Sequence, residues 1–198
     1  EEREHAEDEH ERHAGQAEAG DHAGAVGGGL VVVTRVHAVQ AVVVVQQAVD
    51  GVAAGYTVIG GNHDAVAVQP PAGTDTGAHS MAAQGALWTH EQLSPEQRSF
   101  LAHLPLTAQV GGVLLVHASA EAPENWRYVD NEIVAAECLE AATKHPGVKH
   151  VFCGHVHQQT LYYRGTGRGL MRFTPTAGVP VPVPPHRQWV GTVGSVGQ

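Results

Sequence analysis

The sequence is poor in cysteine and in positive charge. Its 198 residues include two cysteines, Cys138 and Cys153, too few for a disulfide framework, so we expect a reducing, cytoplasmic environment. Lys and Arg number 11 against 20 Asp and Glu, for a net charge of −9. A protein that binds a nucleic-acid backbone needs a basic face, so no such partner is expected.

Long hydrophobic runs are also missing. The longest, such as Ala41–Val45, are far too short to cross a bilayer, so no membrane partner is expected. The acidic N-terminus has neither the basic nor the apolar region of a signal peptide.

The first 29 residues differ in composition from the rest. Residues 1–25 contain no Val, Ile, Leu, Met, Phe, Trp or Tyr. Residues 1–29 include nine acidic residues and two basic ones, Arg3 and Arg12. Such a segment cannot bury enough apolar surface to offset the entropy of ordering it, which predicts a disordered tail. Its histidines could bind stray metal, although a solvated polar tail explains them as well. We divide the chain into this tail (1–29) and one domain (30–198), whose motifs lie in 51–198.

Apolar runs and turn signals along the domain predict alternating helices and strands. Leu30–Thr34 could be a buried strand, and Val36–Val52 could be a helix or an extended run, which periodicity does not decide. Further strands are expected at Tyr56–Ile59, Val113–Val116, Val148–Cys153, Leu161–Arg164, Leu170–Phe173 and Trp189–Val193. Helices are expected at Ala78–Leu93, after the Ser94 cap, and at Asn131–Lys144. This alternation indicates an α/β fold with its chemistry on loops that follow strands.

Three blocks of polar residues follow predicted strands. They are Gly61-Asn62-His63-Asp64, Val116-His117-Ala118-Ser119 and Gly154-His155-Val156-His157. With 15 histidines, about one His-x-His pair is expected by chance, so the third block is weak evidence by itself. The first block uses Asn and Asp, which are rare here, and has a chance probability on the order of one in a thousand. Imidazole and amide oxygen ligands suit Mn, Fe or Zn.

The three blocks, in this order, resemble the later motifs of calcineurin-like metallophosphoesterases. Stretches between the blocks, such as Trp126-Arg127-Tyr128, resemble a bacterial branch of that family, and the resemblance covers about residues 51–198. The resemblance implies a four-layer αββα sandwich whose N-terminal part is degenerate or missing here. It also implies hydrolysis of a phosphomonoester or phosphodiester, carried by a phosphorylated small molecule, a nucleotide or a phosphoprotein.

The resemblance further implies two divalent metal ions, Mn, Fe or Zn. Asn62, His117 and His155 would bind one ion and His157 the other. A hydroxide bridging the two ions would attack phosphorus in line with the leaving alcohol.

The resemblance implies catalytic roles for two residues of the first block. His63 would sit beside the substrate phosphate, where it stabilises charge or protonates the leaving oxygen. Asp64 would hold His63 in orientation, as carboxylates do for working imidazoles.

Two motifs of the family do not stand in this sequence. The family pattern starts with an Asp-x-His block and continues with a Gly-Asp block whose Asp bridges both metals. His37 fits the first His, but Arg35 stands in place of the Asp, and a cation there would repel a metal ion. Either the domain is degenerate or truncated, or residues 1–50 derive from another reading frame. The alternative function is therefore a catalytically impaired metal-binding remnant of the same fold.

Overall fold

The computed structural model describes residues 41–70, 81–165, 167, 169–182, 184 and 186–194. The predicted tail, the predicted strand Leu30–Thr34 and the Arg35 and His37 positions lie outside these residues. Within the described residues, no helix combines the length and the apolar character needed to cross a membrane.

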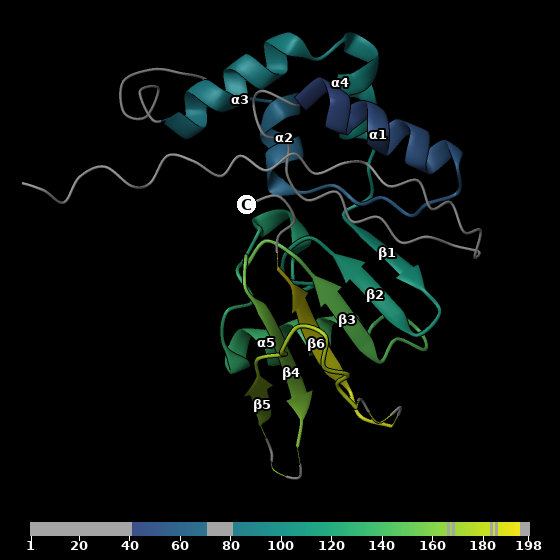
Figure 1. The fold of residues 1–198 in the computed structure, drawn as a ribbon, viewed down its shortest axis with the longest axis vertical. Coiled ribbons are helices and arrows are strands. Elements are labelled where there is room, and N and C mark those ends of the chain that lie inside the picture. Colours follow the sequence, from purple (N-terminus) through teal and green to yellow (C-terminus); the bar gives the residue numbers. More distant parts are fainter. Residues whose placement is uncertain are drawn as a thin grey trace, which may run out of the picture.

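One six-stranded mixed sheet forms the body of the structure (Figure 1). Strand order across it is β1-β2-β3-β6-β4-β5. Strands β2, β3 and β6 run parallel, whereas β1 pairs antiparallel with β2 and β4 pairs antiparallel with both β5 and β6. The strands are β1 (Thr107–Val110), β2 (Val113–Val116), β3 (His150–Cys153), β4 (Gln159–Arg164), β5 (Leu170–Phe173) and β6 (Trp189–Val193).

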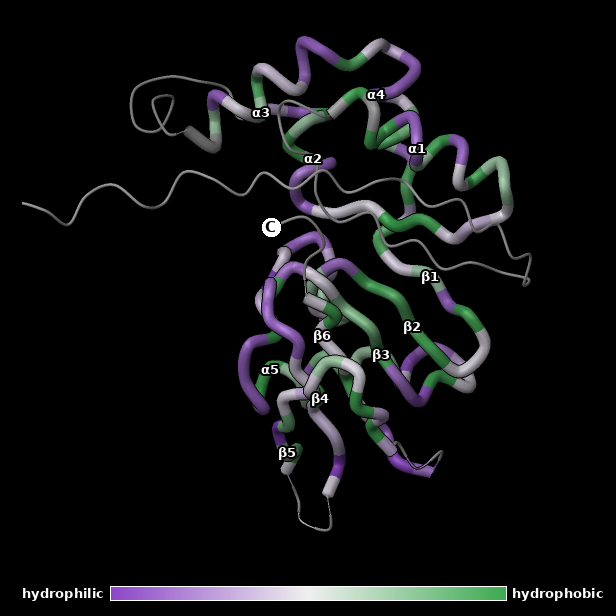
Figure 2. The backbone as a smooth tube through the Cα atoms, viewed as in Figure 1, coloured by the Kyte–Doolittle hydropathy of each residue, from purple (hydrophilic) through white to green (hydrophobic). Residues whose placement is uncertain are grey.

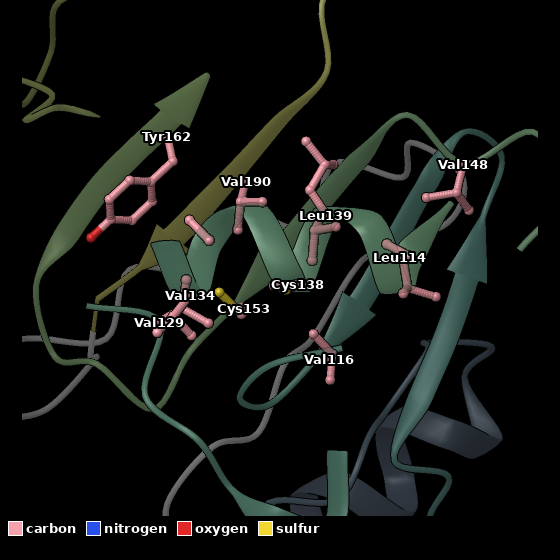
Figure 3. Packing of buried hydrophobic residues seen from close by; sticks show 13 residues of the cluster. Leu114, Val116, Val129, Val134, Cys138, Leu139, Val148, Cys153, Tyr162 and Val190 are labelled. Carbon is pink, nitrogen blue, oxygen red and sulfur yellow. The ribbon is translucent and has the colours of Figure 1, made fainter. Parts of the chain in front are cut away.

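One face of the sheet packs against helix α5 (Glu132–Ala142). Side chains alternate between the two faces of a strand, and the register aligns one apolar row across four strands: Leu114, Val151, Val190 and Tyr162. All four are buried, and they pack against Val134, Cys138 and Leu139 of α5 (Figure 3). This cluster is the main core and fixes the sheet that carries the polar loops.

Four further helices form a second group beyond one end of the sheet (Figure 1). Their smaller apolar cluster consists of Val45, Ala67, Leu93 and Leu101. In Figure 2, β2 is coloured mainly as hydrophobic, whereas hydrophobic and hydrophilic colours alternate along α3. The helices are α1 (Ala41–Ala53), α2 (Asn62–Val68), α3 (Met81–Gln92) and α4 (Pro95–Ala102).

The α/β class predicted from the sequence is confirmed, as are most of the predicted elements. Strands β2, β5 and β6 have the predicted bounds, and β3 and β4 differ at their N-terminal ends. Ser94 caps α4 by accepting a hydrogen bond from the Gln97 N–H, and Asn131 caps α5. The ambiguous run Val36–Val52 is helical where it is described, as part of α1.

Strand β1 and helix α2 were not predicted from the sequence, and one predicted strand is longer than the observed one. Strand β1 was not predicted because Thr107–Val110 is only weakly apolar, although the Gly111-Gly112 turn is a hairpin signal. Helix α2 begins inside the Gly61–Asp64 block, which was predicted to be a loop. The predicted strand Tyr56–Ile59 is wrong in length: only Thr57 forms a bridge, because a strand needs a ladder partner along its whole length.

Candidate metal centre

The loops that follow β2 and β3 lie side by side because these two strands are parallel. His117 comes directly after β2, and Gly154-His155 comes directly after β3. The backbone N–H of Gly154 donates to the carbonyl of His117 at 3.0 Å, which ties the two strand ends together. Helix α2 begins at the same edge and brings Asn62 to it. Residues far apart in the chain therefore meet where parallel strands end, as is common in α/β folds.

Three side-chain atoms converge at this edge. His117 Nε2 lies 2.8 Å from Asn62 Oδ1 and 3.2 Å from His155 Nδ1. The His117 side chain is 2% exposed, and its Nδ1 is buried with no hydrogen-bond partner among the described residues. A ring nitrogen carries either one proton or one lone pair, so His117 Nε2 can make at most one good hydrogen bond, although it has two close neighbours.

The spacing of these atoms fits a shared cation. Two ligand atoms roughly 2.1 Å from one ion stand about 3.0 Å apart in octahedral geometry and about 3.4 Å apart in tetrahedral geometry. The observed separations of 2.8 and 3.2 Å from His117 Nε2 are close to these edges. Two imidazole nitrogens and an amide oxygen also suit Mn, Fe or Zn. The residues present therefore fit one metal ion.

Electrostatics favours neutral imidazoles at this position. The pKa of His117 is lowered to about 4, mainly by burial and in smaller part by the charges of three neighbouring imidazoles: His155, His63 and His157. The histidines of the first and third blocks thus all act on His117. At neutral pH its ring nitrogens carry no extra proton, so a metal ion would not have to displace one.

Gly61 is required at this site by close packing. A Cβ at Gly61 would lie 2.9 Å from His117 Nδ1, 3.0 Å from Cε1 and 3.1 Å from Cγ. The backbone there has φ −120°, which any residue can adopt, so space and not conformation selects glycine. The first residue of the block therefore makes room for the imidazole of the second block.

Asp64 is buried and anchors the start of α2. Its Oδ2 accepts the Gly61 N–H at 2.7 Å, and the side chain is 4% exposed. Burial raises the pKa of this carboxyl to about 6, and the Gly61 hydrogen bond opposes the shift. The predicted contact between Asp64 and His63 stays a prediction. The contact that the structure describes for Asp64 is the hydrogen bond from the Gly61 N–H, which caps the start of α2.

His157 lies on the wall of a polar cavity of about 490 Å³. Arg172 and Thr174 line the same cavity. Among the described residues, no group of three or more His, Cys, Asp or Glu side chains is placed to hold a metal ion. Of the four predicted metal ligands, the described residues thus bring Asn62, His117 and His155 into contact.

Aromatic rings surround the two central imidazoles. The ring of Trp126 meets the His117 ring edge-on at a centroid distance of 5.7 Å, and Tyr128 stacks on His155 at 4.0 Å. Beyond the place of both residues in the Trp126-Arg127-Tyr128 stretch, the sequence carries no signal for either ring contact.

Comparisons with known proteins found similarity among solved structures. No family model matches the chain, and no curated protein matches it. The chain is similar in structure to a metallophosphoesterase from Sphaerobacter thermophilus, with 24% sequence identity and a TM-score of 0.48. The similarity covers 72% of this chain and 54% of the other, so the chain spans about half of that protein's length.

Proposed function

We propose that the chain is a metal-dependent phosphoester hydrolase whose metal centre includes Asn62, His117 and His155. The convergence of these three side chains on His117 Nε2, at 2.8 and 3.2 Å, is the observation that carries the proposal. Bound divalent ions would supply Lewis-acid stabilisation of the phosphoryl oxygens and lower the pKa of a bound water.

The protein residues have separate tasks in this proposal. Neutral His117, kept unprotonated by burial, offers a lone pair near pH 7. Asn62 and His63 are the first two residues of α2, so the helix start fixes the spacing between a ligand and the candidate proton donor. His63 would protonate the leaving oxygen, and His157 would bind a second ion beside the polar cavity that it lines.

The cavity beside His157 is a suitable place for the rest of a phosphorylated substrate. Its lining is mainly polar, with Arg172 and Thr174 on it. A guanidinium is a good partner for phosphate oxygens, so a phosphorylated small molecule, a nucleotide or a phosphoprotein would suit this wall.

A metal-binding remnant without hydrolytic activity is the second candidate. The observation in its favour is that no carboxylate joins the three converging side chains in the described part of the chain. The buried carboxylate of Asp64 is turned to the Gly61 N–H instead. A carboxylate that bridges two ions is the feature such a remnant would lack.

Two measurements separate these candidates. Calorimetric titration with Mn²⁺ should show binding to the full chain that Asn62→Ala and His155→Ala each weaken by at least tenfold. His103→Ala is the matched control: this exposed imidazole, at the end of α4, contacts the Ser99 carbonyl and lies outside the proposed centre, so its loss should leave binding unchanged. A metal site on the histidine-rich tail would survive all three changes and refute the proposed centre.

Activity is then measured with p-nitrophenyl phosphate and its bis ester in the presence of manganese. The hydrolase proposal expects turnover that His63→Ala lowers by about 10²–10⁴-fold, the range for a general acid. Binding of Mn²⁺ without turnover would favour the remnant. Equal turnover in the two proteins would exclude His63 as the proton donor.

A further inference from the structure

Tyr128 is placed on the candidate metal centre although more than half of its side chain is exposed. Its ring stacks on the His155 imidazole with a centroid distance of 4.0 Å and an interplanar angle of 22°. The residue is 55% exposed, so the stack covers one face of the imidazole while much of the tyrosine faces solvent. An aromatic ring this exposed contributes little to the hydrophobic core, so burial of the ring does not account for its place on His155.

His155 occupies a conformation that its own backbone disfavours. Its φ is 63°, and the Val156 N–H donates to the Gly154 carbonyl at 2.6 Å. A hydrogen bond between residues i and i+2 around a positive φ defines the strained form of the γ-turn. A positive φ is unfavourable for a residue other than glycine, so surrounding contacts must hold it.

The backbone on both sides of Tyr128 is anchored. Val129 is 1% exposed and belongs to the main core. The guanidinium of Arg127 forms ion pairs with Glu121, at 3.2 Å, and with Glu137 of helix α5. Exposed ion pairs are weak, so burial of Val129 is the stronger anchor. The backbone of Tyr128 is thus held on both sides, which keeps its side chain near His155 although the ring itself is largely exposed.

The His155 imidazole approaches His117 through one particular ring nitrogen. The nitrogen that lies 3.2 Å from His117 Nε2 is Nδ1. The orientation of the ring therefore decides whether this nitrogen is available at the candidate metal centre.

We propose that Tyr128 is a positioning residue, whose ring holds the His155 imidazole with Nδ1 facing His117. The proposal rests on the proposed function in one respect, since it takes His155 as a metal ligand. Without the stack, the imidazole would be free to rotate about its side-chain bonds, and metal binding would have to order it. A tyrosine that merely covers surface predicts no effect on the centre.

The test compares Co²⁺ affinity, by calorimetric titration, in the full chain and three variants. Aromatic stacking is worth about 0.5–1.5 kcal/mol, so Tyr128→Leu should weaken binding roughly 2- to 13-fold. Tyr128→Phe retains the stack and should bind within about twofold of the parent chain. Tyr56→Leu is the matched control: Tyr56 is 39% exposed and, among the described residues, takes part in no ring contact. It should bind as the parent chain does.

Proton NMR of the metal-free chain supplies a readout that does not depend on metal. The Tyr128 ring current should shift the His155 ring protons upfield in the parent chain and in Tyr128→Phe. The shift should disappear in Tyr128→Leu and persist in Tyr56→Leu. Thermal unfolding of each variant checks that the fold is retained.

The outcomes separate this proposal from the proposed function. If His155→Ala abolishes Co²⁺ binding but Tyr128→Leu leaves it unchanged, the positioning role is refuted and the metal centre stands. If His155→Ala has no effect, the metal centre is wrong and the positioning role falls with it. His155 ring protons with the same shifts in the parent chain and in Tyr128→Leu would refute the stack directly.

Discussion

Gly61→Ala tests whether the Gly61–Asp64 block and His117 are packed as one unit. The added Cβ would lie 2.9–3.1 Å from three atoms of the His117 ring. Carbon atoms normally approach to about 3.5–4.0 Å, so the ring must move by several tenths of an ångström. Its 2.8 Å contact with Asn62 and its 3.2 Å contact with His155 both oppose that movement. Overpacking of this kind costs about 1–3 kcal/mol of the free energy of unfolding.

A matched control separates the clash from other effects of replacing glycine. Gly85 lies inside helix α3, and a Cβ there would meet nothing within 4 Å. Gly85→Ala should therefore stabilise the protein by about 0.5–1 kcal/mol through helix propensity. Urea unfolding in EDTA, followed by circular dichroism, measures both changes. Stabilisation of both variants to the same degree would contradict the packing described for Gly61.

The double variant Gly61→Ala/His117→Ala makes the test specific to one contact. Removing the imidazole leaves room for the new methyl group, so the cost of Gly61→Ala should fall to near zero in the His117→Ala background. The coupling energy should equal the clash, about 1–3 kcal/mol. Additive effects of the two changes would refute the reasoning. Gly61→Ala should also weaken Mn²⁺ binding, because the displaced ring carries Nε2 out of the junction.

Other parts of the structure make three more predictions. Asn131 accepts two backbone N–H groups at the start of α5, so Asn131→Ala should cost about 1 kcal/mol in urea unfolding, whereas Asn131→Asp should cost only tenths. Burial raises the pKa of both Cys138 and Cys153, so neither thiol should react with a disulfide reagent in the native protein at pH 8; rapid labelling would contradict that burial. In the metal-free protein the pKa of His117 is about 4, below its usual 6.5, so the unfolded chain binds the proton first as the pH falls; this lowers the free energy of unfolding by about 3 kcal/mol between pH 6.5 and pH 4. The pKa of Asp64 is raised to about 6, so its protonation raises the free energy of unfolding by a similar amount between about pH 6 and pH 4. The parent chain should thus respond weakly to pH, and His117→Asn should become more stable on acidification; unfolding midpoints between pH 4 and pH 7 check this.

Many of the helices and strands could be predicted because short stretches of sequence determine them. The strands β2, β5 and β6 are short runs rich in apolar or β-branched residues, and turns bound them. The Ser94 and Asn131 caps follow from side chains that satisfy free backbone N–H groups at helix starts. These signals need no knowledge of distant residues. Strand β1 was missed because its pairing with β2, more than its composition, makes it a strand.

For the site, the sequence by itself determined which residues are candidates. The rare combination in Gly61-Asn62-His63-Asp64, followed by His117 and His155, singled out the candidate ligands before any geometry was known. Only the tertiary structure decided how they meet: parallel pairing of β2 and β3 brings His117 and His155 together, and α2 adds Asn62. It alone placed Tyr128 on His155 and gave Gly61 its steric role. The reason is that these are contacts between segments far apart in the chain, which local periodicity does not encode.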